Sequence, residues 1–149
     1  MSAAPGQVVV GYDGSDRARK ALDAARRVAA PGARVKVVYA HRVPPELTYY
    51  EFFQDVLAEL ERGAQETVES ARDAFEGADL DVSYETRRGR PAEVLADIAR
   101  EHDADLIVMG SRGLGRMRAA VGSAVLDLLH DAPCPVLVVP AGDEPAEPS

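Results

Sequence analysis

Short apolar runs alternate with segments of helical periodicity along this chain, and that alternation is the feature that most constrains its fold. The short runs are mostly rich in valine and lie at residues 8–10, 35–40, 81–87, 106–109 and 135–139. The segments between them place apolar residues at every third or fourth position, over residues 16–30, 51–76, 91–102 and 123–130. Strict alternation of this kind is typical of a parallel sheet with helices on both faces, joined by right-handed crossovers. We therefore predict a doubly wound, open α/β fold of five strands.

The pattern within each run indicates how far it is buried. Residues 8–10 and 106–109 are continuously apolar, as in strands that are covered on both faces. Residues 81–87 alternate apolar with polar side chains, which predicts a half-exposed strand at a sheet edge. The segment 51–76 is expected to form one long amphipathic helix, whose apolar stripe is Phe52, Val56, Leu60, Ala64, Val68, Ala71 and Phe75.

The length of 149 residues suits one core, and the sequence contains neither a second core nor an internal repeat. We predict a single domain over residues 1–140. The remaining residues, 141–149 (AGDEPAEPS), are acidic and rich in proline, so we expect them to form a disordered tail.

The charge balance excludes some classes of partner. With 17 basic and 25 acidic residues the net charge is −8, whereas nucleic acids and anionic membranes are bound by basic surfaces. No apolar run approaches the roughly 18 residues that span a bilayer. The N-terminus lacks the pattern of a signal peptide, and the single cysteine, Cys134, cannot form an intrachain disulfide. We expect a cytoplasmic protein that binds neither nucleic acid nor membrane.

Two strand ends carry unusual loops. The first loop, residues 11–15 (GYDGS), places the carboxylate of Asp13 at the rim of the predicted sheet. The second loop, residues 110–115 (GSRGLG), is followed by Gly122 and Ser123 at the start of a helix. Arg112 lies in this loop, and Arg116 and Arg118 lie between the loop and the helix. Glycines allow backbone amides to approach an oxyanion closely, and a helix start adds unpaired amides and a hydroxyl. The second loop therefore suits phosphate binding, although a flexible connection followed by an ordinary helix cap would have the same composition.

Other motifs that carry chemistry are missing from the sequence. The P-loop pattern G-x-x-x-x-G-K-[ST] does not occur, and the dinucleotide fingerprint lacks its third glycine because Arg118 takes that place. No second carboxylate or nucleophile is paired with Asp13. The three histidines, His41, His102 and His130, are scattered and predict neither a metal site nor an acid–base site.

Taken together, five segments resemble the universal stress protein family. They are VVGYDGS (9–15), GRP (89–91), ADLIVMGSRG (104–113), GS (122–123) and APCPVLVV (132–139). The resemblance spans residues 7–140 and implies a sheet of order 3-2-1-4-5, similar to adenine nucleotide α-hydrolases. It also implies a homodimer formed through the last strand. One branch of this family binds ATP through the pattern G-x2-G-x9-G-[S/T].

The family pattern assigns a nucleotide site residue by residue. Asp13 matches the acidic residue that contacts the nucleoside, and Ala40 matches a small residue that lies against adenine. The phosphate positions match Gly110, Gly113, Gly122 and Ser123, and Arg112 lies within the same loop. One departure is the spacing between Gly113 and Gly122, which is eight residues rather than nine.

Two functions from different classes follow. The first is a regulatory module that binds ATP, either alone or together with Mg2+. Any hydrolysis would be slow, because we find no general base and no lysine for the phosphates. The second is a dimeric interaction protein of the same fold that binds no nucleotide, which the shortened spacing favours. An α-hydrolase-like enzyme is a weaker alternative, since the catalytic pairs are missing. An apolar edge strand over Val136–Val139 would be covered by pairing with a second copy.

Overall fold

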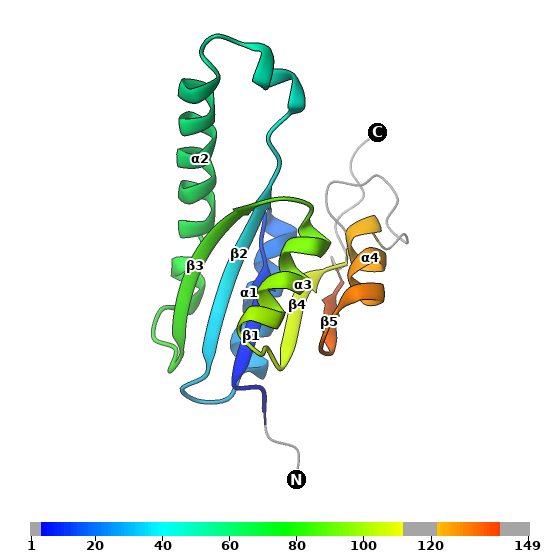
Figure 1. Cartoon of the computed structure of the whole chain (residues 1–149). Coiled ribbons are helices and arrows are strands. Elements are labelled where there is room, and N and C mark those ends of the chain that lie inside the picture. The colour runs from blue at the N-terminus through cyan, green and yellow to red at the C-terminus, as the bar shows by residue number, and fades with distance from the viewer. Residues whose placement is uncertain (1–3, 112–121, 141–149) are drawn as a thin grey trace, which may run out of the picture.

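The computed structural model describes residues 4–111 and 122–140, and within them every predicted strand and helix is present (Figure 1). The strands are β1 (Gln7–Gly11), β2 (Arg34–His41), β3 (Asp81–Arg88), β4 (Leu106–Gly110) and β5 (Val136–Val139). The helices are α1 (Asp16–Val28), α2 (Phe53–Glu69), α3 (Pro91–Glu101) and α4 (Ser123–Asp131). Two short 3-10 helices flank α2, η1 (Pro45–Tyr49) and η2 (Arg72–Phe75). The predicted tail, residues 141–149, lies outside the described residues.

All five strands are parallel and lie in the order β3-β2-β1-β4-β5. This confirms the predicted α/β fold and its strand order. The chain reverses direction across the sheet between β1 and β4, because β2 and β3 extend to one side and β5 to the other. In a doubly wound sheet, ligands bind at the carboxyl ends of the strands at this reversal.

The core consists of two apolar layers, one on each face of the sheet. Helices α1 and α2 cover one face, where Leu22 and Val68 are fully buried against β1 and β2. Helices α3 and α4 cover the other face through Leu95 and Leu128. Because β1 lies between both layers, its residues Val8, Val9 and Val10 are all buried, which explains why its sequence does not alternate.

The long helix predicted over 51–76 is shorter in the structure. Helix α2 ends at Glu69, and η2 continues the chain after a turn. The first turns of α2 project past the carboxyl edge of the sheet (Figure 1), because the chain travels beyond that edge after β2 before the helix begins. Phe52 is therefore 66% exposed and Leu60 38% exposed, although the apolar stripe predicted both to be buried. The later part of the stripe packs as predicted.

Strand β3 forms one edge of the sheet, as its alternating sequence predicted, and β5 forms the other. Over the described residues, no helix is both long and apolar enough to cross a membrane.

Candidate functional site

The loop after β1 is hydrogen-bonded to the neighbouring strand β2. Tyr12 donates its backbone amide to the Val38 carbonyl of β2 at 2.9 Å, and the Tyr12 hydroxyl hydrogen-bonds the Ser70 hydroxyl. Gly11 precedes this loop at a crowded point, where an added Cβ would lie 3.0 Å from Leu95 Cδ1. Glycine at this position lets α3 approach the end of β1 closely. The loop is thus positioned from both faces of the sheet.

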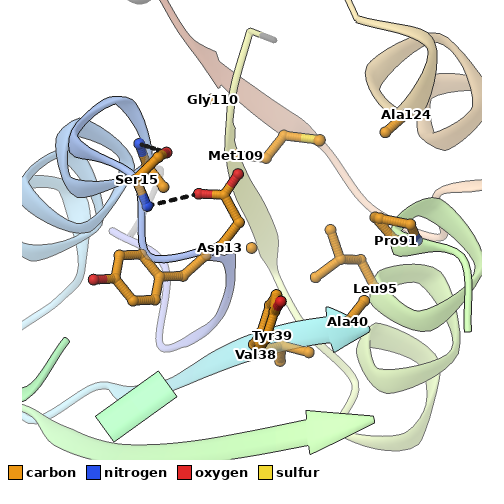
Figure 2. Close-up of a pocket in the computed structure, with 13 residues that line it drawn as sticks. Asp13, Ser15, Val38, Tyr39, Ala40, Pro91, Leu95, Met109, Gly110 and Ala124 are labelled. Carbon is orange, nitrogen blue, oxygen red and sulfur yellow. Dashed lines mark hydrogen bonds between the residues drawn. The ribbon is translucent and has the colours of Figure 1, made fainter. Parts of the chain in front are cut away.

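Asp13 and Ser15 form the turn that starts α1 (Figure 2). The Ser15 amide donates to Asp13 Oδ1 at 2.9 Å, and the Ser15 hydroxyl accepts from the Ala18 amide at 3.1 Å. The first contact is a local side-chain turn and the second is a helix N-cap. Together they hold the Asp13 carboxylate at the strand end, with only one of its oxygens engaged by Ser15.

A cavity of about 140 Å³ opens beside this carboxylate, at the ends of β1, β2 and β4. That is roughly ten times the volume one water molecule needs. Its walls are mainly apolar, formed by Val38 and Ala40 of β2, Leu95 of α3 and Met109 of β4 (Figure 2). Asp13 is the one charged side chain among the described residues that line it. An apolar cavity with a few fixed polar groups is the usual form of a small-molecule site.

The structure brings together three of the residues predicted for the nucleotide site. Asp13, Ala40 and Gly110 come from three different strand ends and line the same cavity. Ser123 lines an adjoining recess instead, which shares Pro91 and Ala124 with the cavity.

The start of α4 is tied to the end of β4. Gly122 donates its amide to the Ser111 carbonyl at 2.8 Å, and Ser111 donates to the Val139 carbonyl at 2.8 Å. Gly122 is the N-cap of α4 and brings no side chain to cap it. The hydrogen bond to Ser111 holds the backbone of Gly122 next to the residue that follows Gly110. Arg112 and Gly113 lie outside the described residues, as do Arg116 and Arg118.

Sequence reasoning missed several cavity residues. Leu95, Met109 and Tyr39 line the cavity, but in the sequence they are ordinary members of apolar patterns. Only the packing of α3 across β1 and β4 identifies which apolar residue faces the opening. Pro91 carried a usable signal. Proline is common at the first position of a helix, so Pro91 marks the start of α3, which follows the carboxyl end of β3.

Two titratable residues outside the cavity wall have shifted pKa values. Burial, with a smaller contribution from Arg88, lowers the pKa of His41, whose ring lies 5.9 Å from that of Tyr39. Burial likewise raises the pKa of the Cys134 thiol, which keeps the thiol protonated. Cys134 packs beside the α3–α4 layer of the core.

Comparisons with known proteins agree with this architecture. The sequence model of the universal stress protein family matches residues 6–140. A universal stress protein of Thermus aquaticus, encoded in the QAH/OAS sulfhydrylase 3′ region, is 39% identical over 135 residues. That alignment covers 89% of this chain and 96% of the relative.

Solved structures are similar as well. A universal stress protein in complex with cAMP is 29% identical, with a TM-score of 0.63, and the match covers 94% of this chain and 100% of that one. A family protein from Arabidopsis thaliana with AMP bound has a TM-score of 0.68, covering 96% and 97% of the two chains. At 14% identity the latter shows the fold alone. On the match to the family model and the Thermus relative, this chain belongs to the universal stress protein family.

Proposed function

We propose that this universal stress protein binds an adenine nucleotide in the cavity beside Asp13. The observation that carries the proposal is the pairing of one carboxylate with an otherwise apolar cavity at the sheet's reversal point. Adenine offers two apolar faces, which suit Val38, Ala40 and Leu95. The Asp13 oxygen that does not bond Ser15 would accept a hydrogen bond from a nucleoside hydroxyl or amino group. The phosphates would then lie toward Gly110, Gly122 and Ser123.

ATP is the nucleotide we infer, and the cAMP held by a similar protein supports the adenine part. In the predicted site Arg112 and Gly113 complete the phosphate loop. Any Mg2+ would arrive with the phosphates, since the described residues hold no group of three or more His, Cys, Asp or Glu placed around a metal. The protein would act as a regulatory module with at most slow hydrolysis, because Asp13 is the one carboxylate at the described cavity wall.

We also propose that two copies pair through β5. This strand lies at the edge of the sheet with its four residues all half-buried, and an open apolar edge favours pairing with an identical strand. If the shortened spacing between Gly113 and Gly122 prevents phosphate binding, such a dimer would be the functional form of an interaction protein. This second function is the alternative outcome of the experiment below.

The test is to denature the purified protein, identify any released nucleotide, and titrate the emptied protein calorimetrically with ATP, AMP, cAMP and adenosine. We expect saturable binding of at least one of them. Ala40→Phe should abolish it by filling the cavity, whereas Ala58→Phe, on the exposed face of α2, should not. No bound nucleotide and no heat at millimolar ligand would overturn the proposal and favour the interaction protein. Binding that survives Ala40→Phe would show that the ligand lies elsewhere.

A further inference from the structure

A polar recess adjoins the cavity at the carboxyl edge of the sheet. The two spaces share Pro91 and Ala124 as a common wall, so a ligand longer than the cavity would extend past these residues into the recess. Arg42, Arg90 and Ser123 are among the residues that line the recess, and Arg90 and Ser123 directly precede the two shared residues in the chain. The cavity itself contributes one negative charge and no positive charge among its described residues.

The fold brings the two arginines together from segments far apart in the sequence. His41 and Arg88 are opposite each other in the register of β2 and β3. The Gly89 amide then donates to the His41 carbonyl at 3.0 Å, which ties the turn after β3 to the end of β2. Arg42 follows His41 and Arg90 follows Gly89, so the two arginines come from adjacent backbone segments, and both line the recess. Gly89 has a φ of +141°, a conformation that keeps this turn specific for glycine.

Neither Arg42 nor Arg90 has an acidic partner among the described residues, in contrast to the two arginines that end β3. The adjacent Arg87 pairs with Glu101 at 2.6 Å, and Arg88 pairs with Glu61. Arg42 and Arg90 form no ion pair or side-chain hydrogen bond within residues 4–111 and 122–140. Their positive charge therefore remains available to a ligand. Guanidinium groups bind phosphate oxygens in a bidentate geometry.

The recess also has acidic residues in its lining. Glu93, Asp127 and Asp131 line it together with His130. Along the axis of α4, Asp127 is about 4.5 Å and Asp131 about 10 Å farther on than the shared residue Ala124, at a rise of about 1.5 Å per residue. Asp131 would repel a ligand that extended along the whole of this side of α4. The recess thus suits a short phosphate chain better than a long polyanion.

We propose that Arg42 and Arg90 are specificity residues for the phosphate chain, so that this protein binds ATP and ADP more tightly than AMP or adenosine. The inference rests on the proposed function, because it requires the adenosine part to occupy the cavity. It adds two residues from outside the glycine loop to the site. In this proposal the two arginines bind the β- and γ-phosphates, which distinguish ATP and ADP from AMP and adenosine.

The experiment compares calorimetric affinities for adenosine, AMP, ADP and ATP in the wild type, Arg42→Ala, Arg90→Ala and the double variant. We expect each single variant to weaken ATP binding about tenfold, the effect of losing one charge-assisted hydrogen bond, and adenosine binding to stay within about twofold. The loss should shrink as salt is raised, because salt screens exposed charges. Asp127→Asn should tighten ATP binding slightly, since it removes a repulsive carboxylate. Arg27→Ala, an exposed arginine of α1 far from the recess, is the charge-matched control.

The outcomes separate this inference from the proposed function. If the wild type binds no adenine compound, the proposed function fails and this inference with it. If the wild type binds ATP but both arginine variants match the Arg27→Ala control, the inference is overturned while the proposed function stands. Equal wild-type affinities for ATP and adenosine would also overturn it. Adenosine binding also reports whether the cavity is intact in each variant. If an alanine variant no longer binds adenosine, the longer polar side chain of Arg42→Gln or Arg90→Gln is tested in its place.

Discussion

The Asp13 carboxylate accepts a 2.9 Å hydrogen bond from the backbone amide of Ser15, and this contact holds a negative charge at the mouth of an apolar cavity. The same carboxylate lies at the N-terminus of α1, where the helix dipole favours negative charge. Asp13 therefore has a structural role, and in our proposal a ligand role as well. Variants can separate the two.

Asp13→Asn and Asp13→Ala should differ in stability but not in the direction of their effect on binding. Asparagine keeps an oxygen for the Ser15 amide, so only the alanine variant should lose the free energy of that hydrogen bond, about 0.5–1.5 kcal/mol. Both should weaken nucleotide binding about tenfold, because both lose the charged acceptor. Urea denaturation and calorimetry measure the two effects. Wild-type affinity in Asp13→Asn would exclude a role for the charge in binding.

Gly89→Ala should destabilise the protein by about 1–3 kcal/mol. Its φ of +141° is strained for alanine, and the added Cβ would lie 2.9 Å from Val94 Cγ2. The matched control is Gly63→Ala, in the middle of α2, where a Cβ meets no atom within 4 Å. That substitution should stabilise the protein by about 0.5–1 kcal/mol, because alanine favours a helix. Similar urea midpoints for the two variants would contradict this account of the turn after β3.

His41 should titrate below its ordinary pKa of 6.5, since burial disfavours its charged form and Arg88 repels it, while Glu61 opposes both effects. A histidine whose pKa is lowered by folding binds fewer protons in the folded state than in the unfolded one. The free energy of unfolding should therefore fall as pH drops below about 6.5 and level off once His41 is protonated in both states. His41→Gln should remove this part of the pH dependence. An NMR titration that places the pKa of His41 at or above 6.5 would contradict the prediction.

Val138→Pro should separate a dimer into folded monomers. The carbonyls of Pro135 and Val139 accept hydrogen bonds from the amides of Ile107 in β4 and of Ser111 just after it. By strand alternation the backbone groups of Val136 and Val138 therefore face the open edge. Proline at 138 removes an amide that only a second copy could use. Proline at 139 removes one directed at β4, and should destabilise the fold by about 1–3 kcal/mol. Sedimentation equilibrium measures the oligomeric state. A monomeric wild type, or a Val138→Pro dimer, would refute pairing through β5.

The fold could be predicted largely from local patterns, because the spacing of apolar side chains reports which faces of an element are buried. Continuous valines at residues 8–10 indicated a strand covered on both faces, and that burial is observed. The same reasoning wrongly predicted that Phe52, just before α2, and Leu60, within it, would be buried. A periodic stripe shows that a helix has an apolar face, but not whether the sheet beneath it is long enough to cover that face.

The candidate site divides in a similar way. Asp13 and Gly110 could be placed at one end of the molecule from sequence, since parallel strands direct all their carboxyl ends to the same edge. Ala40 was placed by family resemblance. Leu95 and Met109 could not be identified as cavity residues, because the packing of α3 decides which apolar side chains face the opening. The juxtaposition of Arg42 and Arg90 depends on strand register and on one backbone hydrogen bond at Gly89.

The sequence by itself determined the alternation of strands and helices, the strand ends that carry unusual loops, and the net charge of −8. These properties follow from neighbouring residues and from composition. Only the tertiary structure decided the shape and lining of the cavity, the projection of α2 and the placement of Arg42 and Arg90 in the adjoining recess. Those depend on contacts between residues far apart in the chain, and no local pattern specifies the register and packing distances that create them.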